Sequence, residues 1–243
     1  MTLPFFYSEE ITTGLSQLVL NEETSRHVVQ VLRMQMGDQL KLTDGLGNIF
    51  TAIITDDHKK RCAVTIHSKE FQQQSQRKVT IAISLIKNSS RFEWFLEKVT
   101  EIGISEIIPL ICERTEKQHF RLDRMKSILV SAMLQSQQCW LPVLQKPMSI
   151  DKLWQSSETL PKLKFDYDQK FIAHCIDEQK RNLSDLTNEN LSTQIILIGP
   201  EGDFTANEIE MAVQHHFIPV ALGNTRLRTE TAGVVAAALL CNI

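Results

Sequence analysis

The sequence predicts an α/β fold with a parallel sheet, preceded by a small β-rich domain. Beyond residue 78, strand-like and helix-like segments alternate, which is typical of a parallel sheet covered by helices. The first of these, VTIAISLI (79–86), is apolar throughout, as expected of a strand buried on both faces. The polar segment EFQQQSQRK (70–78) separates the two patterns, so we place domains at 1–72 and 73–243. Alternatively, residues 70–78 are a surface loop inside a single domain.

The first domain is expected to hold a β-hairpin, a further strand and one short helix. LKLTDGLGNIFTAII (40–54) has two apolar runs around Asp44-Gly45 and Gly47-Asn48, which is a hairpin signal. RCAVTIHS (61–68) is a further strand candidate. SRHVVQVLRM (25–34) predicts a helix with Val28, Val31 and Leu32 on one face.

In the second domain, apolar periodicity and capping residues predict the helices and strands. Ser90 with Glu93, and Thr205 with Glu208, have the spacing of capping boxes that open helices ending near Gly103 and His215. A further amphipathic helix is expected at 122–138, and an Ala-rich helix closes the chain at 231–243. The remaining strands are expected at 105–111, 162–167, 193–199 and 217–223.

Composition excludes several classes of protein. The 243 residues carry a net charge of −3, so any nucleic acid must be held by local basic patches and not by the overall field. No run of 18 apolar residues predicts a membrane span, and the first residues lack the pattern of a secretory signal. The five cysteines show neither a disulfide framework nor a zinc motif, which favours a reducing cytoplasm and no metal.

Two loops follow predicted sheet strands directly and are the candidate ligand-binding segments. GPEGDF (199–204) has glycines that let backbone amides approach a ligand, and LGNTRLRTETA (222–232) brings Gly223 and two arginines before a helix. Ligands of open α/β sheets bind at the carboxyl ends of the strands, so the two loops together predict one pocket. Either loop alone is equally compatible with a tight turn, and neither is a dinucleotide or phosphate-loop fingerprint.

These two loops, in this order before an Ala-rich helix, resemble the cofactor loops of the ribosomal RNA small subunit methyltransferase E family. The resemblance extends to LIKNSSRFEWFLEKVTEIGISEIIPL (85–110), which contains Lys87, Arg91, Lys98, Glu101 and Gly103. It also covers ERTEK (113–117), SAMLQSQQCWLP (131–142), HVVQVLRMQMGD (27–38) and DGLGNIFTA (44–52). The chain departs from the family at Leu3-Pro4, at Asp203 where a glycine is usual, at Thr225-Arg226 and near Cys139-Trp140.

The resemblance implies a knotted (trefoil) SPOUT methyltransferase domain after a PUA-like RNA-binding domain, in a cytoplasmic homodimer. It implies methylation of the N3 position of a uridine in 16S ribosomal RNA, naked or in the small subunit, with S-adenosyl-L-methionine as cofactor. The closing helix, with Val234, Val235, Ala238 and Leu239, is a candidate for the dimer interface or for plain core. The implied cofactor-binding residues are Leu197, Gly199, Pro200, Glu201, Gly202, Leu222, Gly223, Leu227, Arg228 and Thr229.

Catalysis is assigned to Arg228 and Glu230. Uridine N3 must lose its proton before it attacks a methyl group, so a cation near the uracil carbonyls would stabilise the developing charge. Arg228 matches the family's motif, and Glu230 either accepts the proton or orients Arg228; bracing of the loop and capping of the last helix is the structural alternative. RNA-binding roles are expected for Arg33, Lys87, Arg91 and Arg114.

Two other functions remain open from the sequence. One is ribose 2′-O-methylation by a related knotted enzyme, although the N-terminal Asn and Arg motif of those enzymes is not intact here. The other is a non-catalytic RNA-binding protein that keeps only the fold. The glycines at 199, 202 and 223 favour a working cofactor site over the second alternative.

Overall fold

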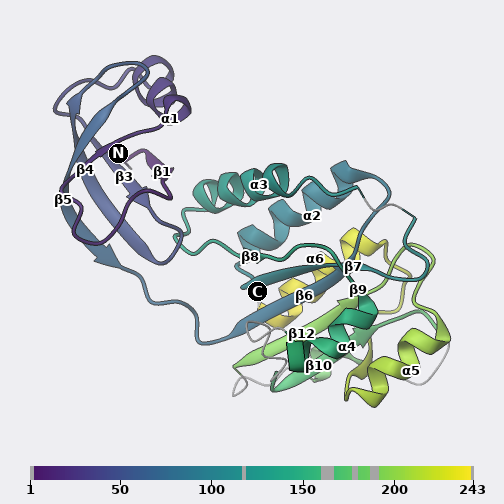
Figure 1. Ribbon diagram of the computed structural model, residues 1–243. Helices are drawn as coiled ribbons and strands as arrows, with labels where there is room; N and C mark the ends of the chain where they lie inside the picture. Colours follow the sequence, from purple (N-terminus) through teal and green to yellow (C-terminus); the bar gives the residue numbers. More distant parts are fainter. Residues whose placement is uncertain (1–2, 117–118, 160–166, 177–179, 187–191, 242–243) are drawn as a thin grey trace. The chain divides into compact units, whose positions relative to one another are not determined.

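The computed structural model describes residues 3–116, 119–159, 167–176, 180–186 and 192–241 (Figure 1). The chain folds into two compact units. The first contains Met1–Gln74 and Met133–Leu141, and the second contains Ser75–Ala132 and Pro142–Ile243. Among the described residues, no helix is both long enough and apolar enough to span a bilayer.

A mixed five-stranded sheet forms the first unit, in the order β1-β3-β4-β5-β2. Strand β1 runs parallel to β3, and the other neighbouring pairs are antiparallel. The β3–β4 pair confirms the predicted hairpin, and β5 confirms the next predicted strand but extends to Phe71. The strands are β1 (Phe5–Tyr7), β2 (Gln17–Val19), β3 (Gln39–Thr43), β4 (Asn48–Asp56) and β5 (Ala63–Phe71).

The helical segment of the first unit differs from the predicted single helix at 25–34. A short α-helix, α1 (Glu22–Arg26), is followed by a π-helical turn, η1 (His27–Val31). Val28 is fully buried, but Val31 and Leu32 are 67% and 42% exposed. The wider π turn shifts later residues around the axis, so the expected common apolar face of these three residues is wrong.

The segment Met133–Leu141 packs against the β3–β4 turn of the first unit. The Gly47 amide donates to the Cys139 carbonyl at 2.9 Å, and the Leu141 amide donates to the Gly45 carbonyl at 2.9 Å. A Cβ at Gly47 would lie 2.4 Å from the Trp140 ring, and its φ is +90°. Glycine is therefore required at position 47 by both space and backbone conformation.

The second unit is built on an eight-stranded sheet in which all the strand pairs are parallel. Its order is β11-β13-β10-β12-β6-β7-β8, with β9 also paired to β7. The strands are β6 (Lys78–Ser84), β7 (Glu106–Ile111), β8 (Val143–Leu144), β9 (Met148–Ser149), β10 (Gln169–Ala173), β11 (Arg181–Asn182), β12 (Thr193–Ile198) and β13 (Ile218–Ala221). The helices are α2 (Ser89–Ile102), α3 (Leu122–Gln135), α4 (Ile150–Thr159), α5 (Ala206–Gln214) and α6 (Thr229–Cys241), with a short 3-10 turn, η2 (Leu183–Asp185).

Helices cover both faces of this sheet, as predicted for an α/β fold. Helices α4 and α5 lie on one face, and α2 and α6 lie on the other (Figure 1). Successive side chains of β6 face opposite sides of the sheet and so pack against both groups of helices. Ala82 joins the core under α4 and α5, whereas Ile83 lies against α6. Strands buried on both faces are apolar at most positions, which is why β6 and β12 could be predicted from the sequence.

Capping residues fix where two of these helices begin. The Thr205–Glu208 capping box is present and opens α5 as predicted. The predicted box at Ser90 and Glu93 is wrong, because the side chain of Asn88 accepts from the Ser90 amide and α2 begins at Ser89. Asparagine caps a helix at least as well as serine, so the earlier residue sets the start.

One central strand and one helix escaped sequence prediction. The strand expected at 162–167 falls mainly on residues outside those described, and the observed strand β10 begins at Gln169. Its central position between β12 and β13 explains the complete burial of Phe171 and Ile172. Helix α4 was not predicted, because only Ile150 and Leu153 mark its buried side before the polar residues that follow.

Helices α2 and α6 approach closely at a glycine. A Cβ at Gly233 would lie 2.5 Å from the Phe95 ring and 3.0 Å from the end of Ile83. Phe95 is completely buried, so it has little freedom to move away. Gly233 therefore sets the distance between α6 and α2.

A partly buried polar cluster lies near the amino ends of β6 and β7. Glu106 accepts hydrogen bonds from Gln145 Nε2 at 2.5 Å and from Thr80 Oγ1 at 3.4 Å. The Tyr167 hydroxyl donates to Thr80 Oγ1 at 3.2 Å. Burial raises the pKa of the Glu106 carboxyl above its ordinary value, and this effect exceeds the opposing effect of its hydrogen-bond donors.

We expect Gly233→Ala to destabilise the protein by about 1–3 kcal/mol, because the added methyl group overpacks the α2–α6 contact. Urea unfolding of the two proteins measures the difference. In a Phe95→Leu background the same substitution should cost less, because the ring that it meets is gone. An equal cost in both backgrounds would show that the contact with Phe95 is not the cause.

We expect Glu106→Gln to stabilise the protein relative to wild type increasingly as pH rises from 5 to 8. A carboxyl whose pKa is raised by folding contributes its full stability below the unfolded pKa, and that contribution is lost as pH rises through the folded pKa. Glutamine cannot ionise and escapes this loss. Urea unfolding across this pH range tests it, with exposed Glu210→Gln as control; a difference independent of pH would contradict it.

Candidate functional site

A cleft of about 780 Å³ lies at the carboxyl ends of β10, β12 and β13. These three strands are neighbours and parallel, so the segments that follow them meet at one edge of the sheet. The lining comes from 173–176, 198–201, Asp203 and 220–229, with Arg91 of α2, Lys180 and Ala232. Both glycine-bearing loops predicted from the sequence line this one cleft.

The loop after β12 is a tight turn built around Gly199 and Asp203. The Asp203 amide donates to the Pro200 carbonyl at 2.9 Å, and Asp203 has a φ of +65°. Left-handed backbone costs an ordinary residue about 1–2 kcal/mol, but aspartate adopts it more readily than most side chains. A Cβ at Gly199 would lie 3.0 Å from the Phe204 ring, so the turn can close only over a glycine.

The loop after β13 joins the cleft to helix α6. Gly223 has a φ of +134°, and apart from its chain neighbours no described residue has an atom within 4 Å of where a Cβ would stand. Backbone conformation, not lack of space, therefore selects glycine here. At the end of the loop, Thr229 begins α6 and its buried hydroxyl donates to the Gly199 carbonyl at 3.1 Å, which ties the two loops together.

Arg91 connects α2 to both loops of the cleft. Its Nη1 lies 3.4 Å from Glu201 Oε1, and its Nε lies 3.6 Å from Glu230 Oε1. The Glu230 side chain is only 7% exposed, and its Oε2 is buried without a hydrogen-bond partner among the described residues. Glu230 thus lies beside Arg91, and within the described part of the chain it forms no hydrogen bond or ion pair with Arg228.

Most of the residues predicted to bind the cofactor line the cleft, and two do not. Leu197 is completely buried in the core beneath α4 and α5, because alternation along β12 turns its side chain to that face. Gly202 lies on the outer side of its loop, where a Cβ would meet the Arg114 side chain at 3.4 Å. The lining members are Gly199, Pro200, Glu201, Leu222, Gly223, Leu227, Arg228 and Thr229.

The four residues predicted to bind RNA have different surroundings. Lys87 is 70% exposed and pairs with Glu116 at 2.7 Å, and this hydrogen bond raises the pKa of the lysine. Arg114 donates to the Gly202 carbonyl at 2.7 Å and so braces the loop from outside. Arg91 lines the cleft, as described above. Arg33 is exposed in the first unit, where its φ is +57°.

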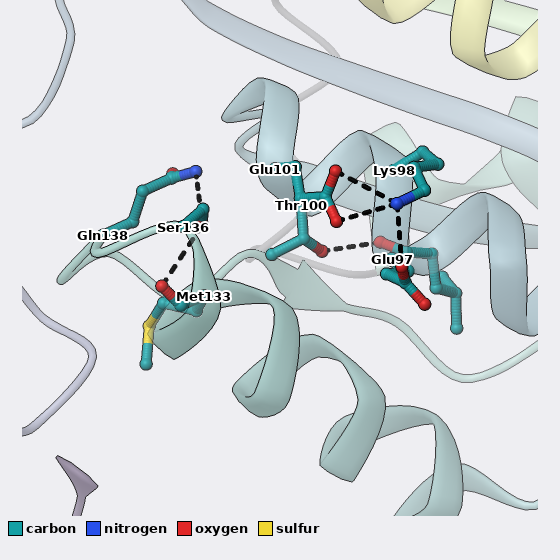
Figure 2. Close-up of polar contacts among 8 residues, drawn as sticks. Glu97, Lys98, Thr100, Glu101, Met133, Ser136 and Gln138 are labelled. Carbon is teal, nitrogen blue, oxygen red and sulfur yellow. Dashed lines mark hydrogen bonds and ion pairs between the residues drawn. The ribbon is translucent and has the colours of Figure 1, made fainter. Parts of the chain in front are cut away.

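Two further charged residues of the family-like segment lie on the surface of α2. Lys98 Nζ contacts Glu101 Oε1 at 2.9 Å and Glu97 Oε1 at 2.8 Å (Figure 2). All three side chains are partly exposed, and none of them lines the cleft. Exposed pairs of this kind stabilise a helix only slightly, by about 0.2–0.5 kcal/mol.

Sequence reasoning missed the third wall of the cleft. Ala173 ends β10, and His174, Cys175 and Ile176 follow it. Together with Lys180 they line a wall of the cleft that neither predicted loop supplies. They were missed because the strand was expected at 162–167 instead of 169–173. The short apolar run FIA (171–173) before His174 and Cys175 was the available signal.

A family model described as an RNA methyltransferase domain matches residues 73–241, and one described as an RNA methyltransferase PUA domain matches residues 20–66. The chain is 33% identical over 220 residues to a Synechocystis protein named ribosomal RNA small subunit methyltransferase E. That match covers 87% of this chain and 68% of the relative.

Solved structures match the whole chain. A probable rRNA-methyltransferase from Porphyromonas gingivalis is 37% identical with a TM-score of 0.87, covering 99% of this chain and 98% of that one. A ribosomal RNA small subunit methyltransferase E from Neisseria gonorrhoeae, bound to S-adenosyl methionine, is 28% identical with a TM-score of 0.84. This match also covers 99% of this chain and 98% of the other.

Proposed function

Because the chain belongs to the RNA methyltransferase family, we propose that it methylates RNA of the small ribosomal subunit with S-adenosyl-L-methionine as methyl donor. The target that the site supports best is the N3 position of a uridine in 16S ribosomal RNA. One observation carries this proposal: the cleft has an arginine, Arg228, at the junction of the glycine loop and α6.

The residues of the cleft suit this cofactor. A volume of about 780 Å³ falls within the usual range of small-molecule sites, about 300–1,000 Å³. Leu222 and Leu227 offer apolar surface, whereas Glu201 adds a negative charge that complements a sulfonium cation. Gly223 leaves room for a ligand near the backbone, since no described residue beyond its chain neighbours lies within 4 Å of its Cβ position. When bound, S-adenosyl-L-methionine supplies an electrophilic methyl group.

The chain's own residues would then have to stabilise a uracil anion, since N3 is a poor nucleophile until its proton is lost. Arg228 is exposed in the cleft and presents a planar, permanently charged guanidinium to the uracil carbonyl oxygens. Glu230 is held by Arg91, so we assign it the task of positioning Arg91 at the rim of the cleft. The alternative role for Glu230 is proton acceptance, which its buried, unpartnered Oε2 would favour.

RNA contacts are proposed for Arg33 in the first unit and for Lys87, Arg91 and Arg114 in the second. The first unit is proposed to act as a PUA-like domain, with the boundary at 72/73. Lys87 and Arg114 already have partners, Glu116 and the Gly202 carbonyl, which RNA phosphates would have to displace or share. Binding should therefore rest on few phosphates and weaken steeply with salt.

The finer fold proposed is a trefoil-knotted SPOUT domain. Helix α6 packs on β6 and β12, and it also contacts the turn η2. That turn belongs to the connection from β10 to β12, and its Leu183 is fully buried. Helix α6 therefore contacts both the sheet and the connection between β10 and β12. These contacts support a fold in which the C-terminal part of the chain is threaded through a loop.

A cytoplasmic homodimer completes the proposal. Within its own chain, α6 buries Gly233, Ala236, Ala237 and Leu240. A second set of apolar residues on the same helix is only partly buried, namely Val234, Val235, Ala238 and Leu239. A partly exposed apolar face on α6 supports the proposal that two copies of the chain pack against each other at this helix.

Mass spectrometry of ribosomal RNA nucleosides tests the reaction. Cells that lack this protein should lose 3-methyluridine from 16S ribosomal RNA, and the wild-type gene should restore it. Loss of a 2′-O-methylated nucleoside instead would identify a ribose methyltransferase. An unchanged nucleoside profile would indicate a protein that binds RNA without modifying it.

Cofactor affinity should distinguish Gly223 from Gly202, although the sequence predicted that both bind the cofactor. Gly223→Ala places a side chain where the backbone has positive φ, at a cost of about 1–3 kcal/mol, so we expect the Kd for S-adenosyl-L-methionine to rise about tenfold. Gly202→Ala is the matched control, because its Cβ meets only the Arg114 side chain at ordinary distance and lies outside the cleft. Calorimetry giving equal affinities for both variants would remove Gly223 from the site.

Arg228→Ala should lower kcat by about 10²–10³-fold with cofactor affinity nearly retained, because the charge it stabilises develops only in the reaction. Arg228→Lys should recover part of the rate, since it keeps the charge but loses the planar fork. Arg226→Ala is the control for loss of one charge from the same loop. If cofactor binding collapses while single-turnover methylation at saturation is normal, Arg228 is structural and the catalytic assignment is wrong.

A further inference from the structure

The wall of the cleft formed by Ala173–Ile176 is fastened to the GPEGDF loop by one carboxylate. Asp203 Oδ2 accepts from the Cys175 amide at 2.8 Å, and Asp203 Oδ1 accepts from the Phe204 amide at 2.9 Å. The first bond joins segments 28 residues apart, whereas the second is local. Only the first can hold the wall.

The same wall is fastened at a second point by a lysine. Lys180 Nζ donates to the His174 carbonyl at 2.5 Å and to the Ile176 carbonyl at 2.7 Å. The Cys175 amide and the carbonyls on either side of it are thus held by two side chains of opposite charge. Charge-assisted bonds of this kind are roughly twice as strong as neutral ones, so the three residues form an ordered strip of backbone along the cleft.

The backbone at Asp203 shows that the turn alone does not need this side chain. Its φ of +65° is the region that glycine adopts without strain, so a glycine would form the same turn more easily. Aspartate adds strain to the turn and, in exchange, adds the bond to Cys175. The link between the two walls is therefore the contribution that a glycine could not make.

We propose that Asp203 is a positioning residue for cofactor binding, which fixes the Ala173–Ile176 wall before the ligand arrives. This inference rests on the proposed function, because it assigns the cleft to S-adenosyl-L-methionine. Ordering a flexible segment upon binding weakens affinity, and a wall that is already ordered avoids that cost. Asp203 acts through the wall, so it affects cofactor affinity and not the rate of methyl transfer.

Two variants of Asp203 separate the link from the turn. Asp203→Gly keeps the turn, relieves its strain and removes both acceptors. Asp203→Asn has nearly the same shape but only one acceptor oxygen, so it can keep only one of the two bonds. Asp151→Asn, which removes an exposed carboxylate from the first turn of α4, is the matched control for loss of charge.

The first measurement is amide hydrogen exchange in the full-length, ligand-free protein. Exchange at the Cys175 amide should be about tenfold faster in Asp203→Gly, intermediate in Asp203→Asn and unchanged in Asp151→Asn. Exchange through β6 and β12 should match wild type in all three variants, which establishes that they are folded. Unchanged exchange at Cys175 in Asp203→Gly would overturn the link.

The second measurement is calorimetric titration with S-adenosyl-L-methionine, followed by methylation kinetics. The Kd and the KM for the cofactor should rise about tenfold in Asp203→Gly and less in Asp203→Asn, with kcat at saturating cofactor and the KM for RNA unchanged. A general disturbance of the site would instead lower kcat. Faster exchange at Cys175 with wild-type cofactor affinity would overturn the positioning role.

Different results would overturn the proposed function and the role of Asp203. Wild-type protein that binds no S-adenosyl-L-methionine would overturn the proposed function and, with it, the role of Asp203 in cofactor affinity. Normal binding by wild type with equal binding by Asp203→Gly would overturn Asp203 alone and leave the proposed function intact.

Discussion

The close contact between Gly233 of α6 and Phe95 of α2 fixes the geometry on which the cleft depends. A glycine at this point lets α6 approach α2 and β6, and any larger residue would collide with a fully buried ring. The first turn of α6 then stands beside the ends of the strands. There the Thr229 hydroxyl reaches the Gly199 carbonyl, and Glu230 reaches Arg91 of α2. Helix packing is therefore what brings these charged residues to the cleft.

Polar contacts between distant segments give the cleft its shape. Asp203 bonds to the wall after β10, Thr229 bonds to the loop after β12, and Arg114 holds that loop from outside. The loop around Gly223 differs, because in the described part of the chain no residue beyond its two neighbours lies within 4 Å of its missing Cβ. The walls after β10 and β12 are fastened by side chains, while the loop that carries Arg228 owes its form mainly to glycine's backbone freedom.

In the second unit, several charged side chains are paired with neighbours of opposite charge, while the net charge of the whole chain is small. The chain is slightly acidic, and several of its cations are already paired: Lys87 with Glu116, and Arg91 with Glu201 and Glu230. Such pairs lower the cost of holding cations close together before an anion arrives. Surface pairs are weak, so a polyanion can exchange with them. This arrangement fits a protein that contacts RNA at a few points and does not coat it.

The sequence by itself determined the α/β class, the strands β6, β7, β12 and β13, the Thr205–Glu208 cap and the two glycine-bearing loops. Each of these features is predicted by a local pattern of apolar spacing, capping residues or turn residues. It could not determine the wall after β10, because the three consecutive apolar residues of that strand are too few to set it apart from its neighbours. Nor could it show that Glu230 meets Arg91, or that Leu197 and Gly202 lie outside the cleft. Those facts depend on which face of the strand or loop each side chain occupies, and on residues more than a hundred positions apart in the chain. Only tertiary packing decides such pairings, since local sequence carries no information about which distant segment will lie alongside.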